Sequence, residues 1–207
     1  MRSIVISYHL DVSPRRVLHR NVHAIVLAAG AGRRLGGRKA RLCIGGETLL
    51  ALHLRSLHAA GFAVTVAVHP DDVALAPGVR AVPSSAPDQA GSLALALAAL
   101  PADDAPVLVV PVDMLPVAAE TLARIVAAFV PGVDAVIPCF EERRGHPPLL
   151  RRTLLRAYDD DAPPLRDVLA AMPRPPLLLE TADPTVVTDL DDAAAVLRAT
   201  GSPPTFA

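Results

Sequence analysis

A loop rich in glycine and basic residues lies near the beginning of the patterned part of the chain, within HAIVLAAGAGRRLGGRKARL at residues 23–42. An apolar run ends there in small residues, and Gly30 and Gly32 let a ligand approach the backbone where a β-carbon would collide. Five cationic side chains accompany the glycines with no acidic residue among them: Arg33, Arg34, Arg38, Lys39 and Arg41. This combination predicts a polyphosphate site; a solvated loop with exposed arginines is the alternative.

Two well-known phosphate-binding patterns are incomplete in this loop. A dinucleotide-binding GxGxxG motif would need glycine at Leu35. A P-loop that starts at Gly32 would need lysine at Arg38 and serine or threonine at Lys39. The segment therefore predicts phosphate binding by a loop of another kind.

A carboxylate follows the most apolar run of the chain. The sequence VLVVPVD places Asp113 directly after residues 107–112, which we expect to form a central strand buried on both faces. Open parallel sheets bind ligands beyond the carboxyl ends of their strands, and Mg2+ prefers carboxylate oxygens. Asp113 is therefore a candidate metal ligand, with capping of the next helix as the alternative.

The composition narrows the classes of function. The chain has 207 residues and a net charge of −1, from 20 Lys+Arg against 21 Asp+Glu, so no global positive field would attract nucleic acid or a membrane surface. Aromatic residues make up 3%, which argues against stacking platforms for single-stranded nucleic acid. Cys43 and Cys139 form no CxxC pair, and no apolar run has the length of a spanning helix. We therefore expect a soluble cytoplasmic protein with free thiols.

Apolar strands alternate with Ala/Leu-rich helical segments from Val22 onward, which is typical of an α/β domain whose mostly parallel sheet carries helices on both faces. Strands are expected at residues 23–28, 64–68, 79–82, 107–112 and 135–140, with a further apolar run at 177–179. Helices are expected at residues 48–60, 92–100, 118–130, 153–158, 165–172 and 192–199. Residues 22–207 thus form one domain. Residues 1–21 are an N-terminal extension for which an edge strand, a mobile tail and an over-called start codon are all open.

The segment LAAGAGRRLGGRKARLCIGGETLL resembles the signature of the nucleotidyltransferases, in particular the molybdenum cofactor cytidylyltransferases and guanylyltransferases. The resemblance extends from Val22 to Leu197. It implies a single-domain, three-layer Rossmann-like sheet of the nucleotide-diphospho-sugar transferase type. In this family the Leu-Ala-Ala-Gly turn holds base and ribose, and the Arg and Lys hold the triphosphate. The nucleotide-binding residues expected in this loop are Leu27, Ala28, Ala29, Gly30, Gly32, Arg34 and Lys39.

The resemblance also bears on the acidic residues. The family places its metal-binding aspartate in a strand-P-x-D-x-P setting, which matches Asp113, although Leu115 stands where the family usually has proline. The sequence TDLDD at residues 188–192 resembles a family segment that precedes the last helix, and Asp189 or Asp191 would complete the metal site. Capping of that helix by Asp191 or Asp192 is the alternative, so Asp189, which lies further from the helix, is favoured as the ligand.

Two further segments resemble parts of the family's substrate site. In APDQAGSL, Asp88 would accept hydrogen bonds from the base, and Ser92 would contact the base or cap the next helix, with the cap favoured. In RRGHPPLL, Arg144 and His146 would bind the acceptor, although a lone histidine more often has a structural role. The remaining histidines show no metal-binding spacing.

The resemblance implies an Mg2+-dependent enzyme that transfers a nucleoside monophosphate from a nucleoside triphosphate to a phosphorylated acceptor and releases pyrophosphate. Its candidate catalytic residues are Arg34, Lys39 and Asp113. The implied acceptor is molybdopterin, and a molybdoenzyme would receive the product. The LAAG and GHP segments favour CTP, whereas GGRK together with Asp88 is similar to the branch that uses GTP. A non-catalytic nucleotide-binding chaperone of molybdoenzyme maturation and a sugar-1-phosphate nucleotidyltransferase are the alternatives.

Overall fold

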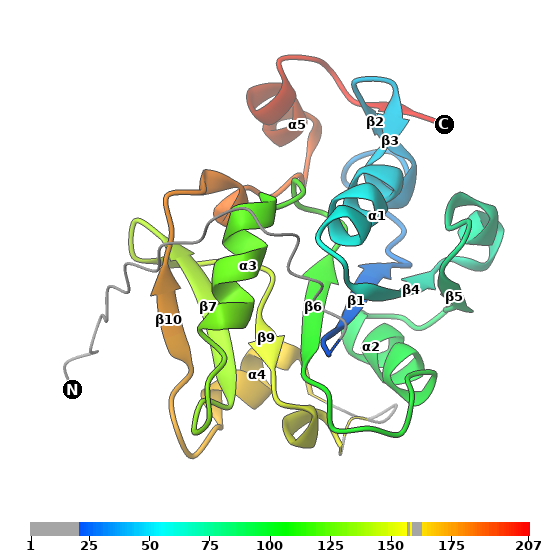
Figure 1. The fold of residues 1–207 in the computed structure, drawn as a ribbon. Helices are drawn as coiled ribbons and strands as arrows, with labels where there is room; N and C mark the ends of the chain where they lie inside the picture. Colours follow the sequence, from blue (N-terminus) through cyan, green and yellow to red (C-terminus); the bar gives the residue numbers. More distant parts are fainter. Residues whose placement is uncertain (1–20, 157, 159–162) are drawn as a thin grey trace.

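An eight-stranded mixed sheet runs through the centre of the molecule (Figure 1). The structure is a computed structural model that describes residues 21–156, 158 and 163–207. The strands follow the order β10 (Leu177–Glu180), β7 (Ala135–Phe140), β9 (Leu149–Leu150), β6 (Val107–Pro111), β1 (His23–Ala28), β4 (Ala63–Val68) and β5 (Arg80–Pro83), and β8 (Arg143–Arg144) pairs with β7.

The sheet is mostly parallel, as the sequence predicts. β1 pairs in parallel with β4 and β6, β4 with β5, and β7 with β10. The short β9 lies between β6 and β7 and is antiparallel to both, and β8 is antiparallel to β7. β8 and β9 were not predicted, because two-residue strands show no alternation of apolar and polar side chains.

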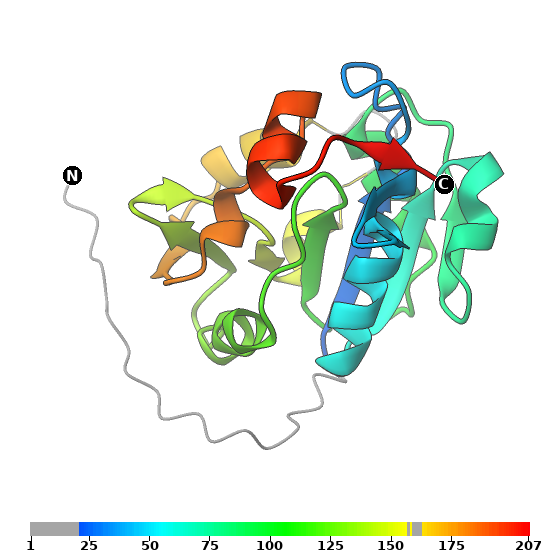
Figure 2. The same cartoon turned by 90° about the horizontal axis from the view of Figure 1, so that it is seen from above.

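Helices cover both faces of the sheet, which confirms the three-layer prediction. α1 (Leu49–Ala59) and α3 (Ala119–Ala127) lie on one side of the strands in Figure 2, and α2 (Gln89–Ala98) and α4 (Leu165–Ala170) pack on the other. Successive side chains of a strand point to opposite faces. Accordingly, Ala24 and Val26 of β1 belong to the core beneath α1, whereas Ile25 and Leu27 belong to the core beneath α2.

A small antiparallel sheet lies outside this core, in the order β11 (Thr205–Phe206), β2 (Leu42–Ile44) and β3 (Glu47–Thr48). Gly45 and Gly46 join β2 to β3 with φ values of 60° and 85°. Both values lie in the left-handed region, which two-residue hairpin turns require. The sequence did not predict this sheet, because each strand has at most three residues.

Several helical segments differ from the expected bounds. α2 begins three residues earlier than expected, and the segment expected to be helical at 153–158 is a short 3-10 helix, η3 (Arg152–Leu155), with residue 157 outside the described residues. Two further 3-10 helices, η2 (Pro70–Leu75) and η4 (Pro184–Val187), are too short to show a helical period. The last helix, α5 (Ala193–Thr200), ends at Gly201 with a φ of 75°.

Three further expectations concern the N-terminal extension, membrane-spanning helices and the two cysteines. The extension expected at residues 1–21 lies outside the described residues, apart from Asn21. Within the part that the structure describes, no helix is both long and apolar enough to cross a lipid bilayer. Cys43 and Cys139 are free thiols, as the composition predicts.

The order of the strands reverses beside β1. After β1 the chain passes to β4 and β5 on one side, and it then returns to β6 on the other side. At such a reversal the loops beyond the strand ends diverge, and open α/β sheets bind their ligands in the resulting crevice. Residues 29–38 follow β1, and Asp113 follows β6. The fold therefore brings the predicted site residues to one edge of the sheet.

Candidate active site

Three segments that are far apart in the sequence meet at Lys39, the first residue of η1 (Lys39–Arg41). Its Nζ lies 2.6 Å from Oδ1 of Asp191 and 3.3 Å from Oδ2 of Asp113. A guanidinium nitrogen of Arg34 lies 3.9 Å from the other oxygen of Asp191. The hydrogen bond from Lys39 is the main cause that lowers the pKa of Asp191. Four of the predicted site residues therefore form one charged cluster.

The loop that carries Asp113 is anchored by backbone contacts. The N–H of Leu190 donates to the carbonyl of Asp113 at 2.7 Å, and Met114 forms a β-bridge with Asp189. The buried ring of His53 is bonded through Nε2 to the carbonyl of Met114 at 2.9 Å. Leu115, which stands where the family pattern has proline, packs against the core. The departure from the family pattern thus leaves Asp113 facing the cluster.

Negative charge accumulates around this cluster. Partial burial, together with the charges of Asp113 and Asp191, raises the pKa of Asp189. Lys39 compensates part of this negative charge, and the side chain of Arg34 is 80% exposed to solvent. An excess of carboxylates over nearby ammonium groups favours the binding of a further cation.

The carboxylates suit Mg2+ in combination with phosphate oxygens. Among the described residues, no three His, Cys, Asp or Glu side chains are arranged to hold a metal ion by themselves. Mg2+ usually takes one or two carboxylates and completes its shell with water and substrate phosphates. Asp113 and Asp191 fit this requirement, because both already face one positive charge, the ammonium of Lys39.

The structure decides the capping alternatives. Asp192 caps α5, because its Oδ1 accepts from the N–H of Ala195 at 2.7 Å. Helix α3, which follows Asp113, has Ala118 as its N-cap and no side-chain cap. The capping roles considered for Asp113 and Asp191 are therefore wrong, and both carboxylates are directed to the cluster instead.

Two of the five loop cations serve the fold. Arg38 donates to Asp72 from Nε at 2.7 Å and from a terminal nitrogen at 3.0 Å, and Arg41 donates from Nε at 2.6 Å. Asp72 lies in η2 and is completely buried. Burial alone would raise the pKa of Asp72, but the hydrogen bonds from both arginines bring it below its usual value. Part of the positive charge of the loop is therefore neutralised by Asp72, whereas Arg34 and Lys39, the two cations expected to bind the triphosphate, line the charged cluster.

Replacing Asp72 with asparagine should destabilise the fold by about 3 kcal/mol, because two arginines lose a buried partner. The pKa of Asp72 is lowered in the folded state, so its contribution is complete above the ordinary carboxyl value of about 4 and is lost as the pH falls through the folded value. Urea unfolding of both proteins measures this: their difference should be largest near neutral pH and shrink in acid. A difference independent of pH would contradict the assignment.

A polar cavity of about 520 Å3 adjoins the charged cluster. It is lined by most of the predicted nucleotide-binding residues: Leu27, Ala29, Gly30, Gly32, Arg34, Lys39, Asp88 and Ser92. Ala28 is completely buried in β1 and is not among the lining residues. A Cβ at Gly32, where φ is +59°, would lie 1.9 Å from the carbonyl oxygen of Gly37. Only glycine fits this turn of the cavity wall.

The polar groups at the start of α2 differ in role from the prediction. Asp88, not Ser92, is the N-cap of α2: its Oδ1 accepts from the N–H of Gly91 at 2.9 Å. Ser92 lies inside the helix and is buried, and its hydroxyl is bonded to that of Ser84 at 2.9 Å. Asp88 and Ser92 nevertheless both line the polar cavity.

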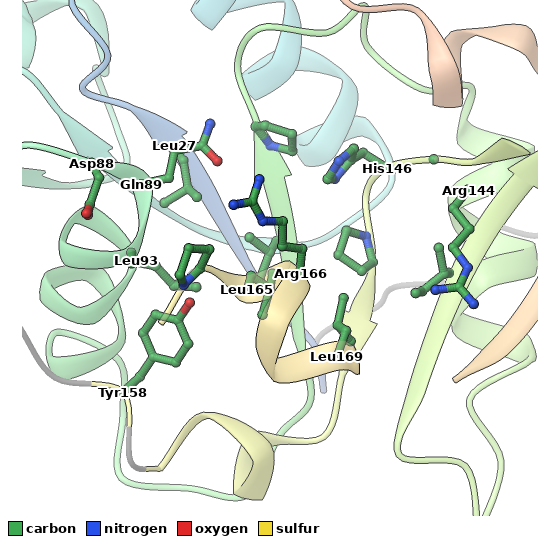
Figure 3. A pocket seen from close by; sticks show the side chains of 17 residues that line it. Leu27, Asp88, Gln89, Leu93, Arg144, His146, Tyr158, Leu165, Arg166 and Leu169 are labelled. Carbon is green, nitrogen blue, oxygen red and sulfur yellow. The ribbon is translucent and has the colours of Figure 1, made fainter. Parts of the chain in front are cut away.

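A second cavity, of about 480 Å3, shares Leu27, Asp88 and Gln89 with the polar one (Figure 3). Its lining is mainly apolar and includes Leu93 of α2 and Leu165 of α4. Ligands bound in the two cavities would therefore lie next to each other. The shape of the site suits a reaction between two small molecules.

The acceptor candidates Arg144 and His146 lie on the strand side of this second cavity (Figure 3). Neighbouring groups partly shield His146 from water and lower its pKa, although the residue as a whole is exposed to solvent, and Asp113 and Asp189 oppose this shift. The ring is therefore neutral near pH 7 and offers hydrogen bonds rather than charge.

Sequence reasoning missed two residues of the second cavity. Arg166 extends toward its middle, and Tyr158 lies at its lower side in Figure 3. The hydroxyl of Tyr158 donates to the carbonyl of Pro163 at 2.8 Å. Both residues lie in or near the six-residue α4, in a part of the chain without a recognisable motif. The short charged pair Arg166–Asp167 in this helix gave no signal for a binding role.

A sequence family and several solved structures resemble this chain. The sequence model of the MobA-like NTP transferase domain matches residues 24–192, and no curated protein matches the sequence. Rv0371c from Mycobacterium tuberculosis H37Rv is similar in structure, with a TM-score of 0.75 and 23% identity over 88% of this chain and 99% of that one. A structure of Rv0371c in complex with manganese has a TM-score of 0.71 and 23% identity, over 87% and 98% of the two chains.

Two further solved structures share the fold. Mth528, a nucleotidyl transferase from Methanothermobacter, has a TM-score of 0.68 and 21% identity over 87% of this chain and 96% of that one. The 2-C-methyl-D-erythritol 4-phosphate cytidylyltransferase from Thermus thermophilus has a TM-score of 0.65 and 23% identity, over 86% and 97%. At such identities structural likeness shows the fold, whereas the family model covers most of the chain. This chain belongs to the family of MobA-like NTP transferase domains.

Proposed function

We propose that this nucleotidyltransferase moves cytidylate from CTP to a phosphorylated acceptor, molybdopterin, and releases pyrophosphate. The observation that carries the proposal is the position of Lys39 between Asp113 and Asp191, beside the polar cavity. A triphosphate in that cavity would lie beside Arg34 and Lys39. An acceptor in the second cavity would lie beside His146.

In the proposed reaction, an oxygen of the acceptor's phosphate forms a bond to the α-phosphorus of CTP. The bond from that phosphorus to the bridging oxygen breaks, and pyrophosphate leaves with the electron pair. A phosphate monoester is already nucleophilic, so positioning and charge neutralisation carry most of the rate. Arg34 and Lys39 would neutralise the triphosphate, and the neutral His146 would orient the acceptor by a hydrogen bond.

The proposal includes a divalent cation, Mg2+. Bound by Asp113 and Asp191, it would offset the charge that develops on the α-phosphate and on the leaving pyrophosphate. The manganese complex of Rv0371c supports a divalent ion in this fold. Carboxylate oxygens are hard ligands that suit Mg2+. Asp189, which the sequence favours as a ligand, stays in the proposed metal-binding set beside Asp113 and Asp191.

CTP should bind at least about tenfold more tightly than GTP, ATP or UTP in calorimetric titrations with Mg2+ present. The LAAG and GHP segments, which resemble those of the cytidylyltransferases, and the cytidylyltransferase among the similar structures support this choice. Asp88, which caps α2 through Oδ1, would also accept from the amino group of cytosine. Tight binding of GTP alone would overturn the choice of nucleotide while leaving nucleotidyl transfer intact.

The acceptor is tested by pyrophosphate release. Molybdopterin should support turnover with CTP, whereas sugar 1-phosphates should not. Turnover with a sugar 1-phosphate would instead assign the protein to the sugar branch. CTP binding without metal-dependent release of pyrophosphate from CTP, whatever acceptor is added, would favour the non-catalytic chaperone. The anchored position of Asp113 supports catalysis.

The proposal also includes a protein partner and a cytoplasmic location. A molybdoenzyme would receive the product, which makes it the expected protein partner. The free thiols of Cys43 and Cys139 fit a reducing cytoplasm.

A further inference from the structure

The glycine-rich loop is held by a segment from the other end of the chain. Residues 191–207, which we call the C-terminal strap, contact the loop region at two places (Figures 1 and 2). Asp191, at the beginning of the strap, binds Lys39. At the other end, β11 pairs with β2, with Thr205 opposite Cys43 and Phe206 opposite Leu42.

The ring of Phe206 lies directly on the backbone of the loop. A Cβ at Gly37 would come within 2.8 Å of two ring carbons of Phe206. The carbonyl of Gly37 in turn lies against Gly32, where a Cβ would be 1.9 Å from its oxygen. The carbonyl of Gly32 accepts from the N–H groups of Leu35 and Gly36 at 3.0 and 3.1 Å. The aromatic ring thus contacts Gly37, and Gly37 contacts Gly32, whose carbonyl accepts the hydrogen bonds of the turn.

The position of the ring is fixed by its neighbours. The N–H of Ala207 donates to the carbonyl of Arg41 at 3.0 Å, and the guanidinium of Arg41 donates to the carbonyl of Ala207 at 3.1 Å. Arg41 is itself held by the buried Asp72. Phe206 remains 36% exposed, so its ring covers the loop rather than filling the core.

We propose that Phe206 is a positioning residue, through which the C-terminal strap holds the loop in the conformation that presents Arg34 and Lys39 to a triphosphate. The inference rests on the proposed function for what the loop binds. The order of the loop is a separate matter that does not depend on the proposed function, because the contacts of Phe206 are made within the chain itself. Without the ring, the loop would have to be ordered at the moment of binding, which weakens affinity.

The first test is the substitution Phe206→Ala. The Kd for CTP with Mg2+ should rise about tenfold, and the KM should rise with it, while kcat stays within about twofold, because the ring does not touch the reacting groups. Phe206→Tyr keeps the ring and should restore binding. In Gly37→Ala the new methyl group would push the ring of Phe206 away from the loop, so this substitution should weaken binding as Phe206→Ala does. Leu197→Ala removes another exposed apolar side chain from the same segment and should change nothing.

The second test needs no ligand. Amide hydrogen exchange at Leu35 and Gly36 should become faster in Phe206→Ala than in wild type or Leu197→Ala, at equal Tm. Unchanged exchange at both amides would overturn the positioning role. A fall in kcat without a rise in KM would overturn it as well. If wild type bound no nucleotide, the proposed function would fail, and the exchange measurement would still decide the role of Phe206.

Discussion

Replacing Asp113 with asparagine should lower the rate of pyrophosphate release by about a thousandfold or more, while the protein stays folded. Asparagine keeps the shape of the side chain but removes one of the two carboxylates that face Lys39 and the proposed metal. The fold should tolerate the change, because the backbone bonds of residue 113 and of the bridge at Met114 remain. A continuous assay of pyrophosphate, with the Tm of both proteins, measures the effect.

Asp104→Asn provides the matched control. Asp104 lies before β6, at the opposite end of the strand that Asp113 follows, and it is paired with Arg156 at the surface. Its loss should leave the rate unchanged. An Asp113→Asn protein as active as wild type would remove this carboxylate from the proposed mechanism.

Replacing Lys39 with methionine should weaken CTP binding and lower kcat/KM by about 100-fold to 1,000-fold. The ammonium neutralises the carboxylates of Asp113 and Asp191 in the free protein, and it would neutralise the triphosphate in the complex. Without it, the remaining negative charges would repel the nucleotide. Titration calorimetry and steady-state kinetics measure the two losses separately.

The same substitution has an electrostatic signature. The pKa of Asp191 is lowered mainly by its hydrogen bond from Lys39, so it should rise in Lys39→Met toward its ordinary value. Carboxyl titration by NMR measures this shift. Arg198→Ala, which removes an exposed charge from the last turn of α5, is the control and should affect neither binding nor titration. An unshifted Asp191 in Lys39→Met would contradict the contact.

Much of the fold could be predicted from the sequence, because its main strands are long enough to show a pattern. The run at residues 107–112 is almost entirely apolar, and the structure buries it at the centre of the sheet. Two-residue strands such as β8, β9 and β11 give no such pattern, and their pairing depends on contacts between distant parts of the chain.

The site shows where reasoning from sequence ends. The loop pattern and the carboxyl ends of two strands suffice to bring Lys39 and Asp113 to one edge. The five cations look alike in sequence, and only the position of Asp72 in a short 3-10 helix separates Arg38 and Arg41 from the rest. A cap depends equally on where its helix begins, which is why the roles of Asp88 and Ser92 differ from the prediction.

Leu27, Asp88 and Gln89 line both cavities, so the two substrates of the proposed reaction would lie next to each other. This arrangement bears on the kinetics of the proposed reaction. Both substrates must be present together, so turnover should pass through a ternary complex. A dinucleotide product would then occupy both compartments at once and bind more tightly than either substrate alone. Under the proposed function, departure of the product would limit the steady-state rate, and a receiving protein that removes it would act as an accelerator.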